Sequence, residues 1–281
     1  CLEKTLFLAN KKLKTATVLF PEYFEAWLIW GMSLAYLGKT HQKYHYFLEA
    51  MSKLQKALEL QQGKSPEMLA DLYREYAQVQ IEIAKHSKEA HDWYLAMEAF
   101  ETSSQHTLQA DPDFWNSFGL TCFALAAQVN DIRLCVKAIH HFKHALSYES
   151  QNYEGWKNLS LAMSFLYEST HDEDHFTQAN ECFSTCAQIH PLAETLWLQW
   201  ASFLCKSGRN VSDAKRIRLS IEKCMKARAI NSASWESSIC LGEALSLLGE
   251  LTDNIEPICE GQNKLLEAVE ALPEDPEAGE L

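Results

Sequence analysis

Histidines beside carboxylates are the residues of this sequence whose types could hold a metal ion. His171 and His175 flank Asp172, Glu173 and Asp174, and imidazole nitrogens and carboxylate oxygens are common zinc ligands. The segment has no HExxH motif, no two cysteines stand at zinc spacing, and its polarity is typical of a turn between helices. We therefore expect no metal site here and no cofactor in the chain.

Two further groups of histidines stand at helical spacing. They are His140, His141 and His144, and His41 with His45. At these positions of a helical repeat a side chain faces solvent or the next helix, so we expect histidines of the helix surface. The sequence has no glycine-rich phosphate loop, nucleophile elbow or pair of catalytic carboxylates. We therefore expect a protein that is not an enzyme.

Composition narrows the class of protein further. The nine cysteines form no CxxC pair, and Cys122, Cys186 and Cys224 fall at apolar or small positions of a repeat, where a free thiol behaves as a small hydrophobe. This favours a reducing, cytoplasmic setting. A net charge of -13 argues against direct binding of nucleic acid, which needs clustered cations. No apolar run reaches the roughly 18 residues that span a bilayer, so we expect no membrane insertion.

The elements that position all these residues follow a repeat led by tryptophan. Trp115, Trp156 and Trp197 are 41 residues apart, and Trp27 lies 88 residues before Trp115. A large apolar residue and then a small one follow each tryptophan, at Trp30-Gly31, Phe118-Gly119, Leu159-Ser160 and Trp200-Ala201. A small residue lies 30 positions after each tryptophan, at Ala57, Ala145, Cys186 and Ala227. Self-similarity at such a period indicates a solenoid, whose units bury their apolar faces against their neighbours.

Each repeat divides into two helical stretches. Apolar residues at helical spacing follow Asp111-Pro112, and Asn130-Asp131 interrupts them before a second helical pattern. Gly208 is a plausible C-cap, and Ser212 can begin the next helix.

These repeats resemble the tetratricopeptide repeat, a helix–turn–helix unit of about 34 residues. The markers of the fourth unit are Trp156, Leu159, Ser160, Ala179, Phe183, Cys186 and Pro191. Seven residues are added between the two halves of the motif, which lengthens the helix pair by roughly 10 Å while keeping its apolar stripe. The resemblance, to a long-helix 41-residue variant, implies an all-α, right-handed α-solenoid of antiparallel helix pairs. It is weaker around Met68–Ala110, where the register is ambiguous.

The predicted organisation has three parts. Residues 1–20 correspond to the second helix of a truncated repeat, 21–272 to six helix pairs in one solenoid, and 273–281 to an acidic tail. Since residues 2–19 carry a wide apolar stripe where a solenoid end should be polar, we expect the natural protein to extend N-terminally. The alternative is that a partner or a second copy covers the stripe, giving end-to-end self-association.

The resemblance also implies a binding surface, because first helices of this family line a concave groove. Carried over by position, its residues are Asn116, Leu120, Phe123, Lys157, Leu161, Phe165, Leu198, Ser202, Ile239 and Glu243. Family members that clamp a C-terminal carboxylate have Lys followed four residues later by Asn. Here Leu161 follows Lys157, so we expect no such clamp. The apolar lining either accepts a peptide or amphipathic helix of a partner protein, or is filled by the chain's own longer helices.

The sequence thus predicts a non-catalytic scaffold or adaptor that binds proteins or peptides. The alternative is a scaffold subunit of an RNA-processing complex, because Leu196–Leu204 and the basic stretch after it resemble a half-a-tetratricopeptide repeat. A third class, the arm of an enzyme whose catalytic domain lies upstream, stays open.

Overall fold

The computed structural model describes the backbone of residues 2–106 and 111–271. Within these ranges the chain forms thirteen α-helices and no β-strand. The prediction of an all-α fold built from helix pairs is therefore confirmed. The predicted acidic tail, 273–281, lies outside the described residues.

The chain divides into two compact units, Cys1–Ser150 and Gln151–Leu281. The helices of unit 1 are α1 (Leu2–Leu19), α2 (Phe24–His41), α3 (Tyr44–Glu59), α4 (Pro66–Ser87), α5 (Ala90–His106), α6 (Pro112–Val129) and α7 (Ile132–Tyr148). Those of unit 2 are α8 (Tyr153–Thr170), α9 (Glu173–Ile189), α10 (Glu194–Val211), α11 (Ala214–Ile230), α12 (Trp235–Thr252) and α13 (Ile255–Ala271). The single continuous solenoid over 21–272 stays a prediction, as does its handedness.

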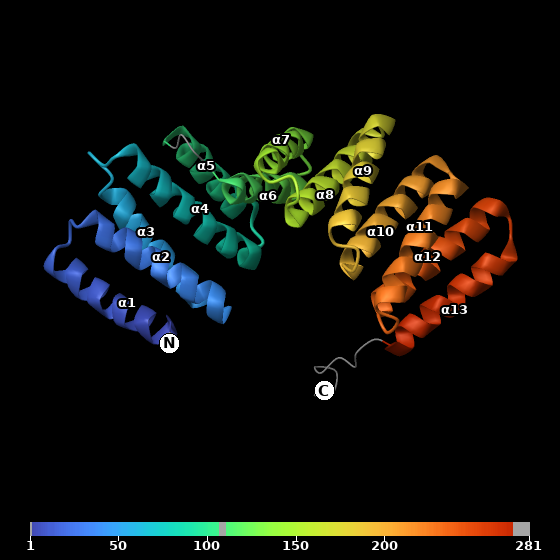
Figure 1. The fold of residues 1–281 in the computed structure, drawn as a ribbon, viewed down its shortest axis with the longest axis horizontal. Helices are drawn as coiled ribbons and strands as arrows, with labels where there is room; N and C mark the ends of the chain where they lie inside the picture. Colours follow the sequence, from blue (N-terminus) through green and yellow to red (C-terminus); the bar gives the residue numbers. More distant parts are fainter. Residues whose placement is uncertain (1, 107–110, 272–281) are drawn as a thin grey trace. The chain divides into compact units, whose positions relative to one another are not determined.

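Antiparallel pairs are the building blocks of both units (Figure 1). In unit 1, α2 packs on α3, α4 on α5 and α6 on α7, while α1 lies against α2. In unit 2 the pairs are α8–α9, α10–α11 and α12–α13. First helices of successive pairs also contact one another, as α8 with α10 and α10 with α12. Helices such as α10 and α12 therefore pack against their own pair and against the neighbouring pair of the same unit, as the repeat predicts.

The period of the sequence is also the period of the helices. The first helices α6, α8, α10 and α12 begin at Pro112, Tyr153, Glu194 and Trp235, 41 residues apart, and each has 18 residues. The ambiguous register of the second repeat has a simple origin, because its first helix, α4, has 22 residues. Four added residues make about one more helical turn.

The turns inside three pairs, α6–α7, α8–α9 and α10–α11, use the same two devices. The residue after the first helix has a left-handed backbone, as at Asn130 and Ser212, where φ is 53°. Its successor then caps the second helix. Asp131, Asp172 and Asp213 each accept a hydrogen bond from the backbone N–H two residues later. Such capping satisfies a donor that the first helical turn leaves free.

Small residues of the repeat lie where the two helices of a pair approach most closely. A Cβ atom added to Gly119 would stand 2.7 Å from the ring of Phe142. The second small marker is buried in all four units where the sequence predicts it, at Ala57, Ala145, Cys186 and Ala227, and Ala268, 41 residues after Ala227, is buried as well. These positions are small because a larger side chain would push the pair apart.

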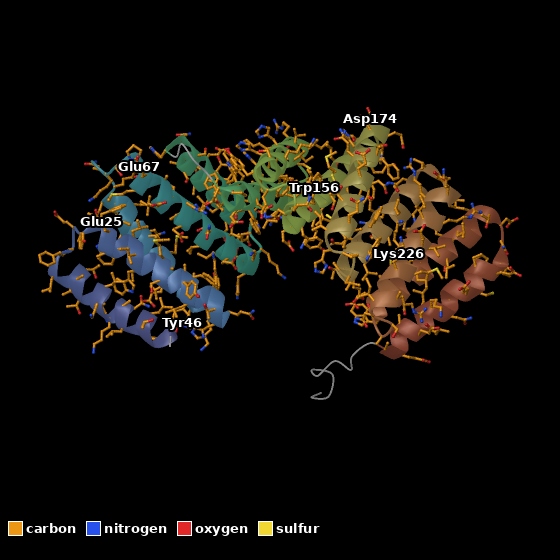
Figure 2. The ribbon with its side chains drawn as sticks, viewed as in Figure 1. Glu25, Tyr46, Glu67, Trp156, Asp174 and Lys226 are labelled. Atoms are coloured by element: carbon orange, nitrogen blue, oxygen red, sulfur yellow. The ribbon has the colours of Figure 1, made fainter. Side chains whose placement is uncertain are left out.

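Two of the marker tryptophans join a helix to the turn before it. The indole N–H of Trp27 donates to the carbonyl oxygen of Pro21, and that of Trp197 donates to Pro191, each at 2.8 Å. Trp197 is buried, and Trp27, Trp115 and Trp156 are half-buried. Figure 2 shows Trp156 on α8. Trp197 is thus packed in the interior of its pair, whereas the other three indoles keep part of their surface exposed.

Candidate binding groove in unit 2

A pocket of about 340 Å³ lies in unit 2 and is lined by the first helices of its second and third pairs. From α10 it takes Leu198, Ser202, Cys205, Lys206 and Arg209, and from α12 it takes Trp235, Glu236, Ile239, Cys240 and Glu243. Four of these residues, namely Leu198, Ser202, Ile239 and Glu243, are groove residues that the sequence predicts. Whether a partner binds there stays a prediction.

Helical spacing explains why these side chains face the same pocket. Along α10 the lining residues are separated by three or four positions, from Leu198 to Ser202, Cys205 and Arg209, which keeps them on one face. The opposite face of α10 is held by packing. Ala201 belongs to a buried cluster with Cys224 of α11 and Leu241 of α12, so α11 fixes both helices from behind.

The two walls of the pocket carry charges of opposite sign. Lys206 and Arg209 belong to the α10 wall, whereas Glu236 and Glu243 belong to the α12 wall. The Lys206 ammonium lies 3.7 Å from the Glu168 carboxylate of α8, and Glu236 accepts a hydrogen bond from the Ser234 hydroxyl at 3.0 Å. Leu198 and Ile239 add apolar area between these charges. The pocket therefore suits an apolar side chain flanked by polar or charged groups.

Burial makes the Cys205 thiol a poor nucleophile. Desolvation raises the pKa of Cys205 to about 11, with the charge of Glu243 acting in the same direction and that of Arg209 opposing it. At neutral pH this side chain stays protonated and behaves as part of the apolar lining.

The other predicted groove residues lie outside this pocket. Lys157, Leu161 and Phe165 are half-buried on α8, and the Lys157 ammonium forms an ion pair with Glu154 and lies 5.6 Å from the centre of the Tyr153 ring. Asn116, Leu120 and Phe123 are half-buried on α6 of unit 1.

Sequence reasoning missed several residues that line the pocket. Arg209 lies eleven positions after Leu198, three helical turns along the same face. Trp235 lies four positions before Ile239 and so one turn earlier on α12. Both could have been found by extending the predicted face to the helix ends. Cys240 directly follows Ile239, and its contact with the pocket depends on the rotation of α12, which no spacing reveals.

Two of the histidines, His175 and His140, lie at the turn and surface positions that the sequence predicts. The His175 ring, in the first turn of α9, lies in hydrogen-bond contact at 2.9 Å with the hydroxyl of Thr170, the last residue of α8. His140 is exposed, in keeping with a surface position. Throughout the described residues, no group of three or more metal-ligating side chains is found.

For His141 the prediction of a surface position is wrong. Its side chain is buried, and its ring lies 4.0 Å from that of Phe118 and 5.4 Å from that of Trp115, measured between centroids. Neither ring nitrogen has a hydrogen-bond partner among the described residues. The error has a physical cause, because α7 turns this residue against the aromatic face of α6 and not toward solvent.

The cysteines lie as the repeat positions predict. Cys122, Cys186 and Cys224 are buried, and the eight cysteines that the structure describes are free thiols. No helix among the described residues combines the length and apolarity needed to cross a bilayer.

Comparison with known proteins finds similar folds among solved structures but no similar sequence. No family profile matches the sequence, and no curated protein matches it. Among solved structures, YrrB, a TPR protein described as having an unusual peptide-binding site, matches with a TM-score of 0.54 at 14% identity, covering 80% of this chain and 95% of that one. MamA from Desulfovibrio magneticus RS-1, residues 41 to the end, matches with a TM-score of 0.52 at 14% identity, covering 73% and 98%.

The chain has the tetratricopeptide-repeat fold. At such identities the likeness concerns the fold alone. Within that TPR fold, the first helices α10 and α12 carry the pocket, and the second helix α11 supports them from behind.

Proposed function

We propose that this chain is a non-catalytic scaffold or adaptor that binds a peptide or helical segment of a partner protein along its first helices. The observation that carries the proposal is the pocket between α10 and α12. It is lined by the surfaces that the TPR fold leaves open on neighbouring first helices. The peptide-binding site described for YrrB, which has the same fold, supports it.

Leu198 and Ile239 offer contact to an apolar side chain, and the charged walls select its flanks. An acidic group beside the anchor would face Lys206 and Arg209, and a basic group would face Glu236 and Glu243. Charge complementarity of this kind sets the orientation of a bound segment. The free thiols support a cytoplasmic, reducing setting for the interaction.

The RNA-processing alternative gains little from the basic helix α11. The Arg216 guanidinium lies 3.8 Å from the centre of the Phe176 ring and donates to the Tyr167 hydroxyl at 2.9 Å. Lys223 lies 4.4 Å from the Trp200 ring, and Lys226, visible in Figure 2, lies 4.9 Å from the Trp197 ring. Packing within unit 2 thus accounts for these cations without an RNA-processing partner.

Peptide selection on the full chain tests the proposal. Peptides are selected from a displayed library, and the affinity of the best one is measured by fluorescence anisotropy. Glu243→Lys inverts one wall of the pocket, and Ser202→Trp fills it. We expect each to weaken binding by about tenfold or more, equivalent to about 1.4 kcal/mol.

Glu260→Lys is the matched control. Glu260 is exposed on α13, so this substitution makes the same charge change away from the pocket. Its affinity should equal that of the original chain. If Glu243→Lys and Ser202→Trp bind the selected peptide as tightly as this control, the pocket is not the binding site and the proposal fails.

A further inference from the structure

Two cysteines of unit 2 come together at the pocket from different helices. Cys224 belongs to α11 and Cys240 to α12. The Cys224 thiol donates to the Cys240 sulfur, with 3.0 Å between the two Sγ atoms. The repeat places a small core residue at Cys224, and packing alone does not require a second sulfur opposite it.

The two thiols differ in exposure. Cys224 is fully buried in a cluster with Ala201, Leu241 and Leu245. Cys240 is half-buried and lines the open pocket. A small molecule in the pocket therefore reaches Cys240, whereas Cys224 lies in the buried cluster.

Their proton affinities differ in the same sense. The hydrogen bond from Cys224 lowers the pKa of Cys240, although burial and the charge of Glu243 oppose this. That same hydrogen bond, with burial, raises the pKa of Cys224. The thiolate of the pair is therefore favoured on Cys240, and a thiolate is the reactive form of cysteine.

We propose that Cys240 is a peroxide-reactive thiol, and that Cys224 resolves its oxidised form into a disulfide joining α11 to α12. In the first step the Cys240 thiolate attacks one oxygen of hydrogen peroxide, the O–O bond breaks, and the leaving hydroxide takes up the proton that the Cys240 thiol released, giving water. Cys240 becomes a sulfenic acid and the peroxide is reduced by two electrons. In the second step the Cys224 sulfur attacks the Cys240 sulfur, the S–O bond breaks, and the Cys224 proton leaves with hydroxide as water. Two thiols and one peroxide thus give one disulfide and two waters.

The geometry favours this pair over the other thiols of the unit. A disulfide needs its sulfurs at about 2.05 Å, so Cys224 and Cys240 must approach by about 1 Å. Cys205 also lines the pocket, but the sulfur in contact with that of Cys240, at 3.0 Å, is the Cys224 sulfur. Cys259 is exposed on α13, so a comparison with it separates reactivity from mere accessibility.

The first test is oxidation of the full chain with stoichiometric hydrogen peroxide, followed by quenching of free thiols and mapping under non-reducing conditions. Cleavage after glutamate at Glu222, Glu236 and Glu243 puts Cys224 and Cys240 in separate peptides, and Cys259 in a third. We expect the first two to be recovered as one cross-linked species that has lost two hydrogens. Cross-linking of Cys205 to Cys240, or oxidation of Cys259 with Cys240 left reduced, would overturn the proposal.

A second measurement does not depend on the disulfide. The rate of alkylation of Cys240 by iodoacetamide is followed against pH, and its midpoint should lie below the ordinary cysteine value of about 8.5. Cys224→Ala removes the donor and should move the midpoint upward, slowing alkylation several-fold at neutral pH, while Cys259→Ser leaves it unchanged.

Circular dichroism establishes that Cys224→Ala keeps its helices. If this buried variant loses them, the profile of the unmodified chain decides by itself. A midpoint at or above the ordinary value would contradict the assignment of Cys240 as the nucleophile. This inference stands apart from the peptide-binding proposal, because neither measurement involves a peptide.

Discussion

His141 is a buried titratable side chain whose two ring nitrogens lack hydrogen-bond partners within the described residues. Desolvation lowers the pKa of His141 to about 4, and the charges of His140, Lys137 and His144 act in the same direction. The imidazole is therefore held neutral between the rings of Trp115 and Phe118. His141 thus acts as an aromatic packing residue, and its protonation is disfavoured in the folded state.

We predict that stability falls as the pH is lowered through the range between the two pKa values of His141. The unfolded side chain binds a proton near pH 6.5, but the folded one does so only near pH 4. Between these values the unfolded state binds more protons, so acid favours unfolding. The loss should be about 1–2 kcal/mol after allowance for solvent screening.

Urea unfolding of the chain and of His141→Phe between pH 7.5 and 4.5 measures this contribution. Phenylalanine keeps the ring stack and removes the unpaired nitrogens, so the variant should be at least as stable at neutral pH. Its advantage should grow on acidification. Parallel stability curves for the two proteins would mean that the folded imidazole takes up its proton at the ordinary pH.

Trp200 is a second residue whose surroundings determine how much it contributes to the stability of the fold. Its indole N–H donates to the Asn180 side chain at 2.8 Å, its ring stacks on Phe183 with centroids 5.9 Å apart, and the Lys223 ammonium lies 4.4 Å from it. We predict that Trp200→Ala costs about 3–5 kcal/mol by leaving a cavity, whereas Trp200→Phe costs about 1–2 kcal/mol by losing the hydrogen bond. Chemical unfolding measures both, and equal losses would show that the ring makes no packing contribution of its own.

At the scale of the helices, the turns within pairs contain strained residues whose replacement by glycine should stabilise the protein. Gln42, the residue after α2, has φ of 52°, a left-handed conformation that costs a side chain with a Cβ atom about 1 kcal/mol. We predict that Gln42→Gly stabilises the protein by about 0.5–1 kcal/mol, after part of the gain is offset by the freedom of glycine in the unfolded chain.

The next residue provides the control for that prediction. Lys43 has an extended backbone, with φ of -111°, so Lys43→Gly gains nothing and should destabilise. Asn130→Gly should give a smaller gain than Gln42→Gly, because asparagine tolerates the left-handed region better. Thermal unfolding ranks the three variants. A melting temperature for Gln42→Gly no higher than for Lys43→Gly would contradict the strain argument.

The helices and their core were predictable from the sequence because the same pattern of large and small apolar residues recurs in several repeats. Ala57, Ala145 and Cys186 occupy the same position of different repeats, so each of them supports the prediction that the other two are buried. The lining of the pocket could be predicted only in part, at four of its ten residues. Leu198 and Ile239 follow from their repeat positions, but the contact of Cys240 with Cys224 depends on how far α12 is rotated against α11. His141 was misplaced for a similar reason, since a residue at the border of a helix face is buried or exposed by a small rotation.

At the scale of the whole molecule, α1 offers the surface best suited to a second copy. Its inner side, including the half-buried Leu13, packs against the core of the first pair. Its outer side exposes Phe7, Leu8, Val18 and Leu19, with exposed fractions of 50%, 55%, 72% and 66%. The spacing of eleven residues between Phe7 and Val18, and between Leu8 and Leu19, places them along one stripe of the helix. Exposed apolar stripes of this kind commonly mark contacts.

We therefore predict concentration-dependent self-association of the chain through α1. Lys11, Lys12 and Lys14 are exposed between the two apolar ends of the stripe, so two copies would bring like charges together. Salt screens this repulsion over about 10 Å at 0.1 M, and association should strengthen with ionic strength, opposite to an interaction dominated by ion pairs. Sedimentation equilibrium at low and high salt measures both effects. Leu8→Glu with Val18→Glu should abolish them, whereas Leu192→Glu, at a 73% exposed position before α10, should not. A chain that stays monomeric at every salt concentration would leave α1 available for a different partner protein.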